Sequence, residues 1–215
     1  MSYYPVYLDL RGRPVVVVGG GAVAEEKVRG LLGAGARVKL VAPELTPELA
    51  RLAAEGLVAW LPRAYRRGDL AGAFLVVAER VDPRTDRRVF EEAEARGIFA
   101  NVQDDVPHCS FIAPSIVRQG DLTVAISTAG KAPVLAVRLR QQLERLLGPE
   151  HARFLALAGT VRKPLAERYP DFSERRDRWY RLIDSDVLEL LRQGEEDAAR
   201  ERFDEILGVA PGEAA

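Results

Sequence analysis

The chain has very few of the side chains that build disulfide frameworks and metal centres. Its 215 residues include one cysteine, Cys109, and two histidines, His108 and His151. One thiol cannot form an internal disulfide, and these residues fall short of the four ligands of a structural zinc site. We therefore expect His108 to be a hydrogen-bonding loop residue and Cys109 a small buried one, with no metal held by the protein.

Long apolar segments and an excess of charge are also missing. The longest apolar runs are far shorter than the roughly 20 residues that cross a bilayer, and no basic-then-apolar leader opens the sequence. A net charge of −1 gives no overall attraction to nucleic acid or to a membrane. With its single cysteine, the chain is predicted to be a cytoplasmic globular protein without nucleic-acid or membrane partners.

The strongest positive pattern is a short strand followed by three glycines and a helix. Residues 15–18 are four consecutive valines, which is typical of a strand buried on both faces of a parallel sheet. Gly19 and Gly21, with Ala24 in the third small position, fit the G-x-G-x-x-G/A spacing of dinucleotide-binding loops. Gly21 leaves room for a pyrophosphate at the helix start, where backbone N–H groups and the helix dipole favour an anion. A plain tight turn between strand and helix is the alternative.

Strands and helices alternate as far as residue 102. This order predicts an α/β fold with a doubly wound parallel sheet of Rossmann type. Strands are predicted at residues 6–10, 15–18, 37–41, 57–61, 74–78 and 98–102, with helices at 22–34, from Thr46, and from Asp82 to Gly97.

The pattern changes after residue 102. Apolar segments at 111–117 and 122–127 predict a pair of strands, and 134–147 predicts a helix with an apolar face; the rest is helical and highly charged. We expect three parts: an NAD-binding Rossmann domain (1–113), a small α+β module that pairs two copies of the chain (114–147), and a helical C-terminal domain (148–215).

The second strand ends without the acidic residue that holds the ribose of NAD in many such folds. Pro43 and Glu44 follow Ala42 instead. Glu44 either reaches the ribose or merely starts a turn, and Pro43 offers an apolar wall to an adenosine. No arginine stands at this strand end to receive a 2′-phosphate, which favours NAD over NADP.

Two later segments carry polar side chains suited to a substrate. Asp104 and Asp105 follow a sheet strand at the edge where open α/β sheets bind ligands, and a carboxylate there can exchange a proton during oxidation. Adjacent aspartates are also common in turns. Ser127, Thr128 and Lys131 stand in a second glycine-bearing loop, where they either hold anionic substrate groups or cap the helix that follows.

Taken together, these segments resemble the siroheme-synthase dehydrogenase family, the precorrin-2 dehydrogenases, some of which are also sirohydrochlorin ferrochelatases. The residues that carry the resemblance are 4–10, 18–27, 41–43, 101–105, 109–114 and 125–136. The resemblance implies a homodimer that uses NAD⁺ to oxidise precorrin-2, a tetrapyrrole with many carboxylates, to sirohydrochlorin. In some members Fe²⁺ insertion into sirohydrochlorin is a second activity. All but four of the 31 basic residues are arginines. These arginines either lie on solvated helix faces or bind substrate carboxylates.

The resemblance also implies roles for individual residues. Its essential aspartate matches Asp104 rather than Asp105, and its cofactor contacts match Ala22, Val23, Pro43 and Glu44.

The chain departs from the family pattern in three ways. After the fourth strand, where Ala-Thr-Asp/Asn is common and the cofactor is expected nearby, this chain has Ala78 followed by Glu79, Arg80, Val81 and Asp82. Thr128 replaces a serine that is modifiable in some relatives. The sequence ends without the methyltransferase domain of multifunctional relatives, so we expect a stand-alone form.

Two other functions remain open: oxidation of a different small molecule with NAD, and sensing of NAD(H) by a regulatory module without catalysis. The fold alone does not decide among them.

Overall fold

The computed structural model describes residues 3–212. The chain divides into one unit that ends at Ala113 and a second that begins at Pro114. Each unit has its own apolar core, and each is described by itself.

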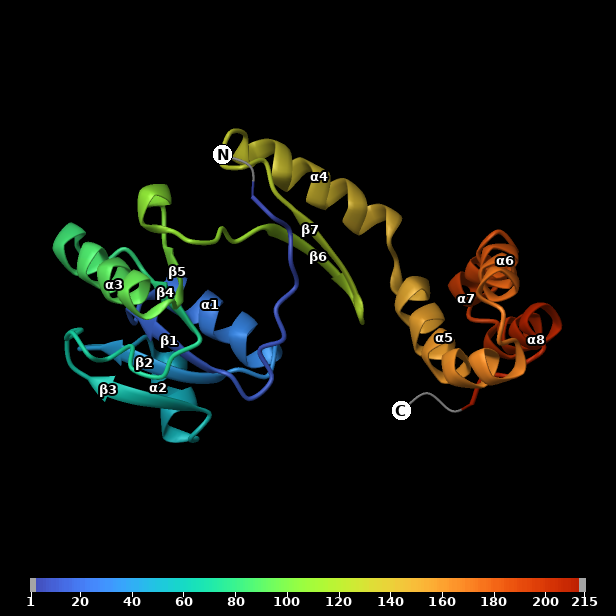
Figure 1. Ribbon diagram of the computed structural model, residues 1–215, viewed down its shortest axis with the longest axis horizontal. Helices are drawn as coiled ribbons and strands as arrows, with labels where there is room; N and C mark the ends of the chain where they lie inside the picture. Colours follow the sequence, from blue (N-terminus) through green and yellow to red (C-terminus); the bar gives the residue numbers. More distant parts are fainter. Residues whose placement is uncertain (1–2, 213–215) are drawn as a thin grey trace. The chain divides into compact units, whose positions relative to one another are not determined.

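The first unit is a five-stranded parallel sheet covered by helices on both faces (Figure 1). The strand order is β3-β2-β1-β4-β5, so β1 lies in the middle between β2 and β4. The predicted Rossmann-type fold is thereby confirmed. The strands are β1 (Pro14–Val18), β2 (Arg37–Ala42), β3 (Val58–Pro62), β4 (Leu75–Ala78) and β5 (Phe99–Val102), and the helices are α1 (Ala22–Gly33), α2 (Pro47–Ala54) and α3 (Pro83–Arg96).

Alternate side chains of β1 enter two different cores. Val15 and Val17 pack with α1 and α2 on one face of the sheet. Val16 and Val18 pack with α3 and the segment around Leu70 on the other face. Because both faces are covered, β1 has an unbroken run of valines instead of an alternating pattern.

The strand order reverses beside β1, with β2 and β3 on one side and β4 and β5 on the other. Open α/β sheets bind ligands at such a switch point, beyond the carboxyl ends of the strands. The segments that leave these ends of β1 and β4 are residues 19–21 and 79–81. The fold therefore brings the glycine loop and the unusual Glu79 segment to the same edge of the sheet.

Residues 6–10 are irregular, and the strand predicted for them is wrong. Both pairing edges of β1 are already taken by β2 and β4. Val6 and Leu8 stay exposed, while Leu10 packs against the core. Tyr7 and Asp9 are exposed as well, so burial does not alternate along this segment.

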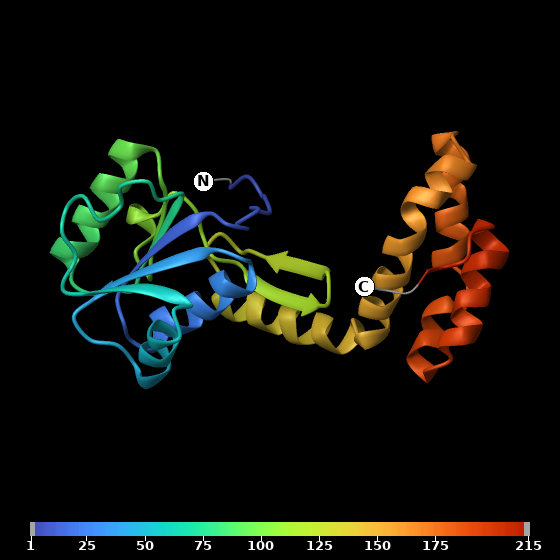
Figure 2. The ribbon, with the colours of Figure 1, turned by 90° about the horizontal axis from the view of Figure 1, so that it is seen from below.

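The second unit begins with an antiparallel hairpin of β6 (Ser115–Gln119) and β7 (Leu122–Ile126), which packs against α4 (Pro133–Leu146) (Figure 2). β6 starts later than predicted, just after Pro114, whose ring nitrogen cannot donate to a strand partner. Four more helices enclose an apolar core that includes Leu182, Leu191 and Phe203: α5 (Pro149–Arg168), α6 (Phe172–Ile183), α7 (Val187–Gln193) and α8 (Glu196–Leu207). Within residues 3–212, no helix has both the length and the apolar character of a membrane span.

Candidate cofactor and active site

The glycine loop is held by hydrogen bonds to the end of β2 and to the segment after it. The Gly19 N–H donates to the Val41 carbonyl (3.1 Å), and the Gly20 carbonyl accepts from the Thr46 N–H (2.9 Å). Gly19 has a φ of +125°, which favours glycine. A Cβ on Gly20 would overlap the backbone carbonyl of Glu44. Gly20 is therefore required by a close backbone contact, and Gly19 by its backbone conformation.

The start of α1 offers an anion site. Gly21 is the N-cap and has no side chain with which to cap the helix. Its N–H donates to a carboxylate oxygen of Glu79 at 2.8 Å, which shows that an anion fits at this position. The loop and helix start thus suit the pyrophosphate of a dinucleotide, which would bind the N–H groups of residues 21–23.

The remaining predicted cofactor residues lie around this loop. Ala22 is exposed and Val23 half-buried in the first turn of α1. Pro43 and Glu44 are exposed just after β2, and the Glu44 carbonyl touches Gly20. The structure brings all six predicted cofactor residues to one edge of the sheet: Gly19, Gly21, Ala22, Val23, Pro43 and Glu44. Their contacts with NAD remain predictions.

Trp60 lies next to this edge and was not singled out from the sequence. Its indole Nε1–H donates to the Ala42 carbonyl at the end of β2 (2.9 Å), and its ring is partly exposed. This contact depends on the pairing of β2 with β3, so no local sequence signal indicates it. Trp60 offers a fluorescent reporter beside Pro43 and Glu44.

Asp104 lies in a tight turn directly after β5. The Asp105 N–H donates to the Val102 carbonyl (3.2 Å), and Asp104 has a φ of +55°, a left-handed conformation that aspartate adopts more readily than most residues. The Gln103 N–H donates to the carbonyl of Ala78 at the end of β4 (2.9 Å). The turn is thereby tied to the same sheet edge as the glycine loop, and the Asp104 side chain is exposed there.

Asp105 has a different environment from Asp104. Its carboxylate pairs with the His108 Nδ1 at 2.8 Å, and the His108 ring packs edge-on against Phe90. Asp104 accepts only from the neighbouring Gln103 amide among the described contacts (3.1 Å). Asp104 is the more exposed of the two carboxylates, and its catalytic role remains a prediction.

Cys109 and Ser110 close the free edge of β5. The Val102 N–H donates to the Cys109 sulfur (3.2 Å), and the Ala100 N–H donates to the Ser110 hydroxyl (2.8 Å). The buried Asn101 amide donates to the Phe111 carbonyl (3.0 Å). Because β5 is an edge strand, these contacts satisfy polar groups that a further strand would otherwise pair. They also hold the Asp104 turn in place.

The thiol of Cys109 is expected to react slowly. Burial raises its pKa, and the thiolate is the reactive form. We predict that Ellman's reagent modifies the folded protein at least about tenfold more slowly than the urea-unfolded chain at the same pH. Equal rates would show that the thiol does not hold the edge of β5.

The polar residues of the second glycine-bearing loop lie in the second unit. The Ser127 hydroxyl accepts from the Ala129 N–H (3.0 Å), and the Thr128 hydroxyl accepts from the Ala132 N–H (3.3 Å). Both hydroxyls thus shape the loop that leads into α4, but neither caps the helix, whose N-cap Ala132 has no side-chain cap hydrogen bond; their roles toward a substrate remain predictions. The Lys131 side chain is exposed, and its role in holding substrate carboxylates remains a prediction.

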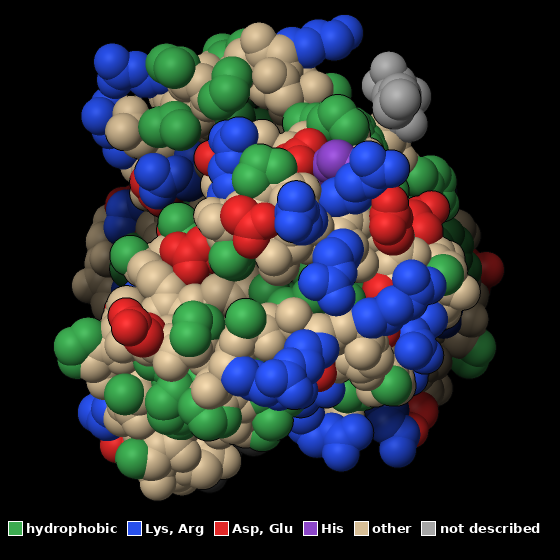
Figure 3. All heavy atoms as spheres, turned by 90° about the vertical axis from the view of Figure 1, so that its left-hand side faces the viewer, with side chains coloured by type: hydrophobic (Ala, Val, Ile, Leu, Met, Phe, Trp, Pro, Cys, Tyr) green, Lys and Arg blue, Asp and Glu red, His purple; other side chains and the backbone are tan. Residues whose placement is uncertain are grey.

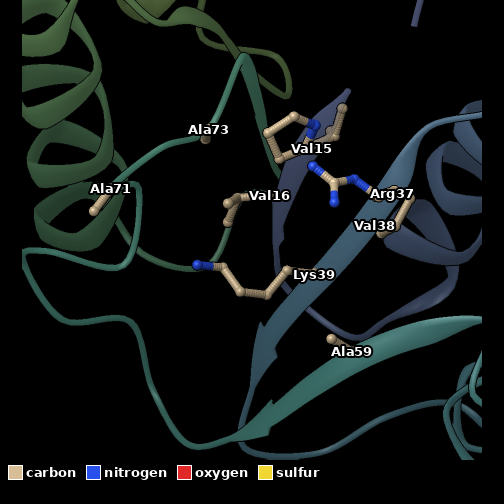
Figure 4. Close-up of a pocket in the computed structure, with 9 residues that line it drawn as sticks. Val15, Val16, Arg37, Val38, Lys39, Ala59, Ala71 and Ala73 are labelled. Carbon is tan, nitrogen blue, oxygen red and sulfur yellow. The ribbon is translucent and has the colours of Figure 1, made fainter. Parts of the chain in front are cut away.

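A cavity of about 270 Å³ lies at the opposite end of the sheet from this site (Figure 4). The Lys39 side chain reaches toward it from β2, and its Nζ donates to the Asp69 carbonyl (2.6 Å). The lining residues are Pro14, Val15, Val16, Arg37, Val38, Lys39, Ala59, Ala71 and Ala73. They include the amino ends of β1 and β2, so this cavity is separate from the glycine loop at the carboxyl end of β1.

Six of the thirteen arginines in residues 3–113 form ion pairs with acidic side chains. On α3, Arg87 pairs with Glu91 (2.8 Å) and Arg96 with Glu92 (2.9 Å). Figure 3 shows basic and acidic side chains interspersed over one face of the molecule. This arrangement is typical of solvated helix faces. Within residues 3–212, no three His, Cys, Asp or Glu side chains gather as metal ligands would.

A Rossmann sheet with a glycine loop at its switch point defines a dinucleotide-binding protein. The family model described as "Putative NAD(P)-binding" matches residues 6–115. The models "Sirohaem biosynthesis protein central" and "Sirohaem synthase dimerisation region" match residues 119–146 and 150–207. The chain therefore belongs to the family described as putative NAD(P)-binding, and its other segments match sirohaem-synthesis models. The predicted resemblance and the NAD cofactor are confirmed.

Known relatives agree with this membership. Siroheme synthase 1 of Aeromonas salmonicida is 43% identical over 213 residues, which are 99% of this chain and 46% of the relative. Siroheme synthase 3 of Aeromonas hydrophila is 44% identical over 207 residues, 96% of this chain and 44% of the relative. The chain thus spans a little under half the length of these curated relatives. The solved structure of SirC, precorrin-2 dehydrogenase, has a TM-score of 0.75 and 25% identity, covering 96% of this chain and 100% of that one.

Proposed function

We propose that this chain oxidises precorrin-2 to sirohydrochlorin with NAD⁺. The observation that carries the proposal is the shared position of the glycine loop and the exposed Asp104 on one edge of one sheet, linked by the Gln103 to Ala78 hydrogen bond. The substrate is inferred from the precorrin-2 dehydrogenase activity named for the SirC structure and from the siroheme synthase relatives.

Each part of the edge has a role in this reaction. Gly19, Gly21 and the first turn of α1 hold the pyrophosphate, while Pro43 and Glu44 flank the adenosine side. The bound cofactor supplies a hydride acceptor. Oxidation also releases a proton, and we assign its acceptance to Asp104, because its exposed carboxylate is not neutralised by a cation among the described residues.

Titration with NAD⁺ followed by addition of precorrin-2 tests this proposal against the sensor hypothesis. We expect Trp60 fluorescence to change on NAD⁺ binding, and anaerobic addition of precorrin-2 to produce NADH over many turnovers. Binding without turnover would favour a sensing module. The titration is repeated with Trp60→Phe to distinguish Trp60 from Trp179. A fluorescence change that persists in this variant comes from Trp179.

Iron insertion is proposed as a second activity of the same edge. The macrocycle itself supplies four nitrogen ligands, so the protein needs to remove two N–H protons without holding the metal. The exposed Asp104 suits that role as well. Incubation of sirohydrochlorin with Fe²⁺ or Co²⁺ should change its visible spectrum faster with the protein than without it; equal rates would exclude this activity.

The chain is proposed to form a homodimer through α4. Leu135 is 52% exposed and Leu139 37% exposed, although both lie on the apolar face of that helix. A second copy would cover this face. The family model for a dimerisation region covers residues 150–207 instead, where Phe172 and Tyr180 on α6 are exposed. An interface at α4 and an interface at α6 predict different effects of substitutions on dimer formation.

We expect a dimer by light scattering at micromolar concentration. Leu135→Glu should convert it to a monomer, because a charge in an apolar interface is costly to desolvate. Tyr180→Glu on α6 is the matched control and should leave the dimer intact. A monomeric wild type, or dissociation by Tyr180→Glu alone, would contradict the interface at α4.

The cytoplasmic location, the absence of nucleic-acid and membrane partners, and the division of the second unit at residue 147 remain predictions.

A further inference from the structure

The segment after β4 places a glutamate over the glycine loop. The Glu79 N–H donates to the Val18 carbonyl at 2.8 Å, which fixes its backbone beside the end of β1. Its carboxylate turns toward α1 and accepts from the Gly21 N–H at 2.8 Å. A Cβ added to Gly19 would lie 2.5 Å from the Glu79 Cβ, and one added to Gly21 would lie 2.5 Å from its Oε1. The side chain therefore fills the space that the two glycines keep clear.

We propose that Glu79 competes with the cofactor pyrophosphate for the start of α1 and thereby sets the affinity for NAD⁺. This inference rests on the proposed function. Both groups are anions, and both need the Gly21 N–H and the positive end of the same helix dipole. They cannot occupy that place together, so the carboxylate must leave before the pyrophosphate binds.

The hydrogen bond between Glu79 and Gly21 stabilises the free protein but opposes the binding of NAD⁺. In the free protein, a charge-assisted hydrogen bond between Glu79 and Gly21 stabilises the loop. Binding of NAD⁺ breaks this bond and leaves a displaced carboxylate close to another anion. Removing the negative charge should therefore weaken the free protein and strengthen cofactor binding. A residue with a purely structural role would not produce both changes.

Glu79→Gln and Glu79→Thr test the proposal by calorimetric titration with NAD⁺. Glutamine keeps the size of the side chain without its charge, and threonine is common at this position in the family pattern. We expect both variants to bind NAD⁺ roughly tenfold more tightly than the wild type. Glu94→Gln removes a charge from an exposed position on α3 and should leave the affinity unchanged.

Two further measurements separate competition from other effects. Without ligand, Glu79→Gln should melt roughly 2–4 °C below the wild type, while its stabilisation by saturating NAD⁺ should be larger. Adenosine carries no phosphate, so its affinity should not change in either variant.

The outcomes are distinct for the two proposals. Wild-type binding of NAD⁺ with equal or weaker binding by both Glu79 variants would overturn the competition and leave the proposed function standing. An equal gain for adenosine would also overturn it, since the pocket would then simply be wider. Failure of wild type and variants alike to bind NAD⁺ would overturn the proposed function together with this inference.

Discussion

Replacement of Asp104 by asparagine is expected to abolish the oxidation of precorrin-2 while leaving NAD⁺ affinity unchanged. A positioned acid–base group contributes about 10²- to 10⁴-fold to a rate, and we expect a loss of kcat in this range. Asparagine is nearly isosteric and tolerates the φ of +55° at this position, so the turn should persist. Steady-state kinetics with purified precorrin-2 and a parallel NAD⁺ titration measure the two effects separately.

Asp105→Asn is the matched control, because the same chemical change is made one residue away. The Asp105 carboxylate is already paired with His108, so turnover should fall by no more than a few-fold. Full activity of Asp104→Asn, or a greater loss in Asp105→Asn, would contradict the assignment of the proton acceptor to Asp104.

Replacement of Gly20 by alanine is expected to destroy the cofactor site. The new Cβ would overlap the Glu44 carbonyl, and a backbone atom cannot move aside as a flexible side chain can. Overpacking of this kind costs about 1–3 kcal/mol, and a displaced loop no longer presents the N–H groups of α1 together. We expect NAD⁺ affinity to fall by at least about tenfold, with a lower melting temperature.

Gly30→Ala gives the comparison within the same helix. Gly30 lies inside α1, and a Cβ there would meet open space. Alanine is the better helix former, so this variant should gain about 0.5–1 kcal/mol of stability and bind NAD⁺ normally. Unchanged melting temperature and NAD⁺ affinity in Gly20→Ala would show that the loop is not constrained as described.

The parts of the fold that depend on local patterns could be predicted from the sequence. The valine run at β1 is explained by burial on both faces, and the glycine loop by a backbone conformation and contacts that exclude side chains. Thr46 caps α2 and Asp82 caps α3, as their positions before proline and a helical pattern indicate. Such signals lie within a few residues of the element that they specify.

Features that depend on distant neighbours could not be read in this way. Residues 6–10 have strand-like polarity, but both edges of the neighbouring strand β1 are taken by β2 and β4. The Glu79 contact joins residues 58 positions apart; the sequence marked the segment as unusual without showing where its carboxylate lies. Cys109 and Ser110 complete an edge strand, a role visible only once β5 is known to be the last strand of the sheet.

A single-turnover reaction tests the central claim most directly. Precorrin-2 is mixed anaerobically with NAD⁺ and an excess of the protein, and NADH and sirohydrochlorin are both quantified. The account predicts one NADH and one sirohydrochlorin for each precorrin-2 consumed, formed at least about a hundredfold more slowly with Asp104→Asn. Saturation with NAD⁺ but no formation of NADH or sirohydrochlorin by the wild type would contradict it.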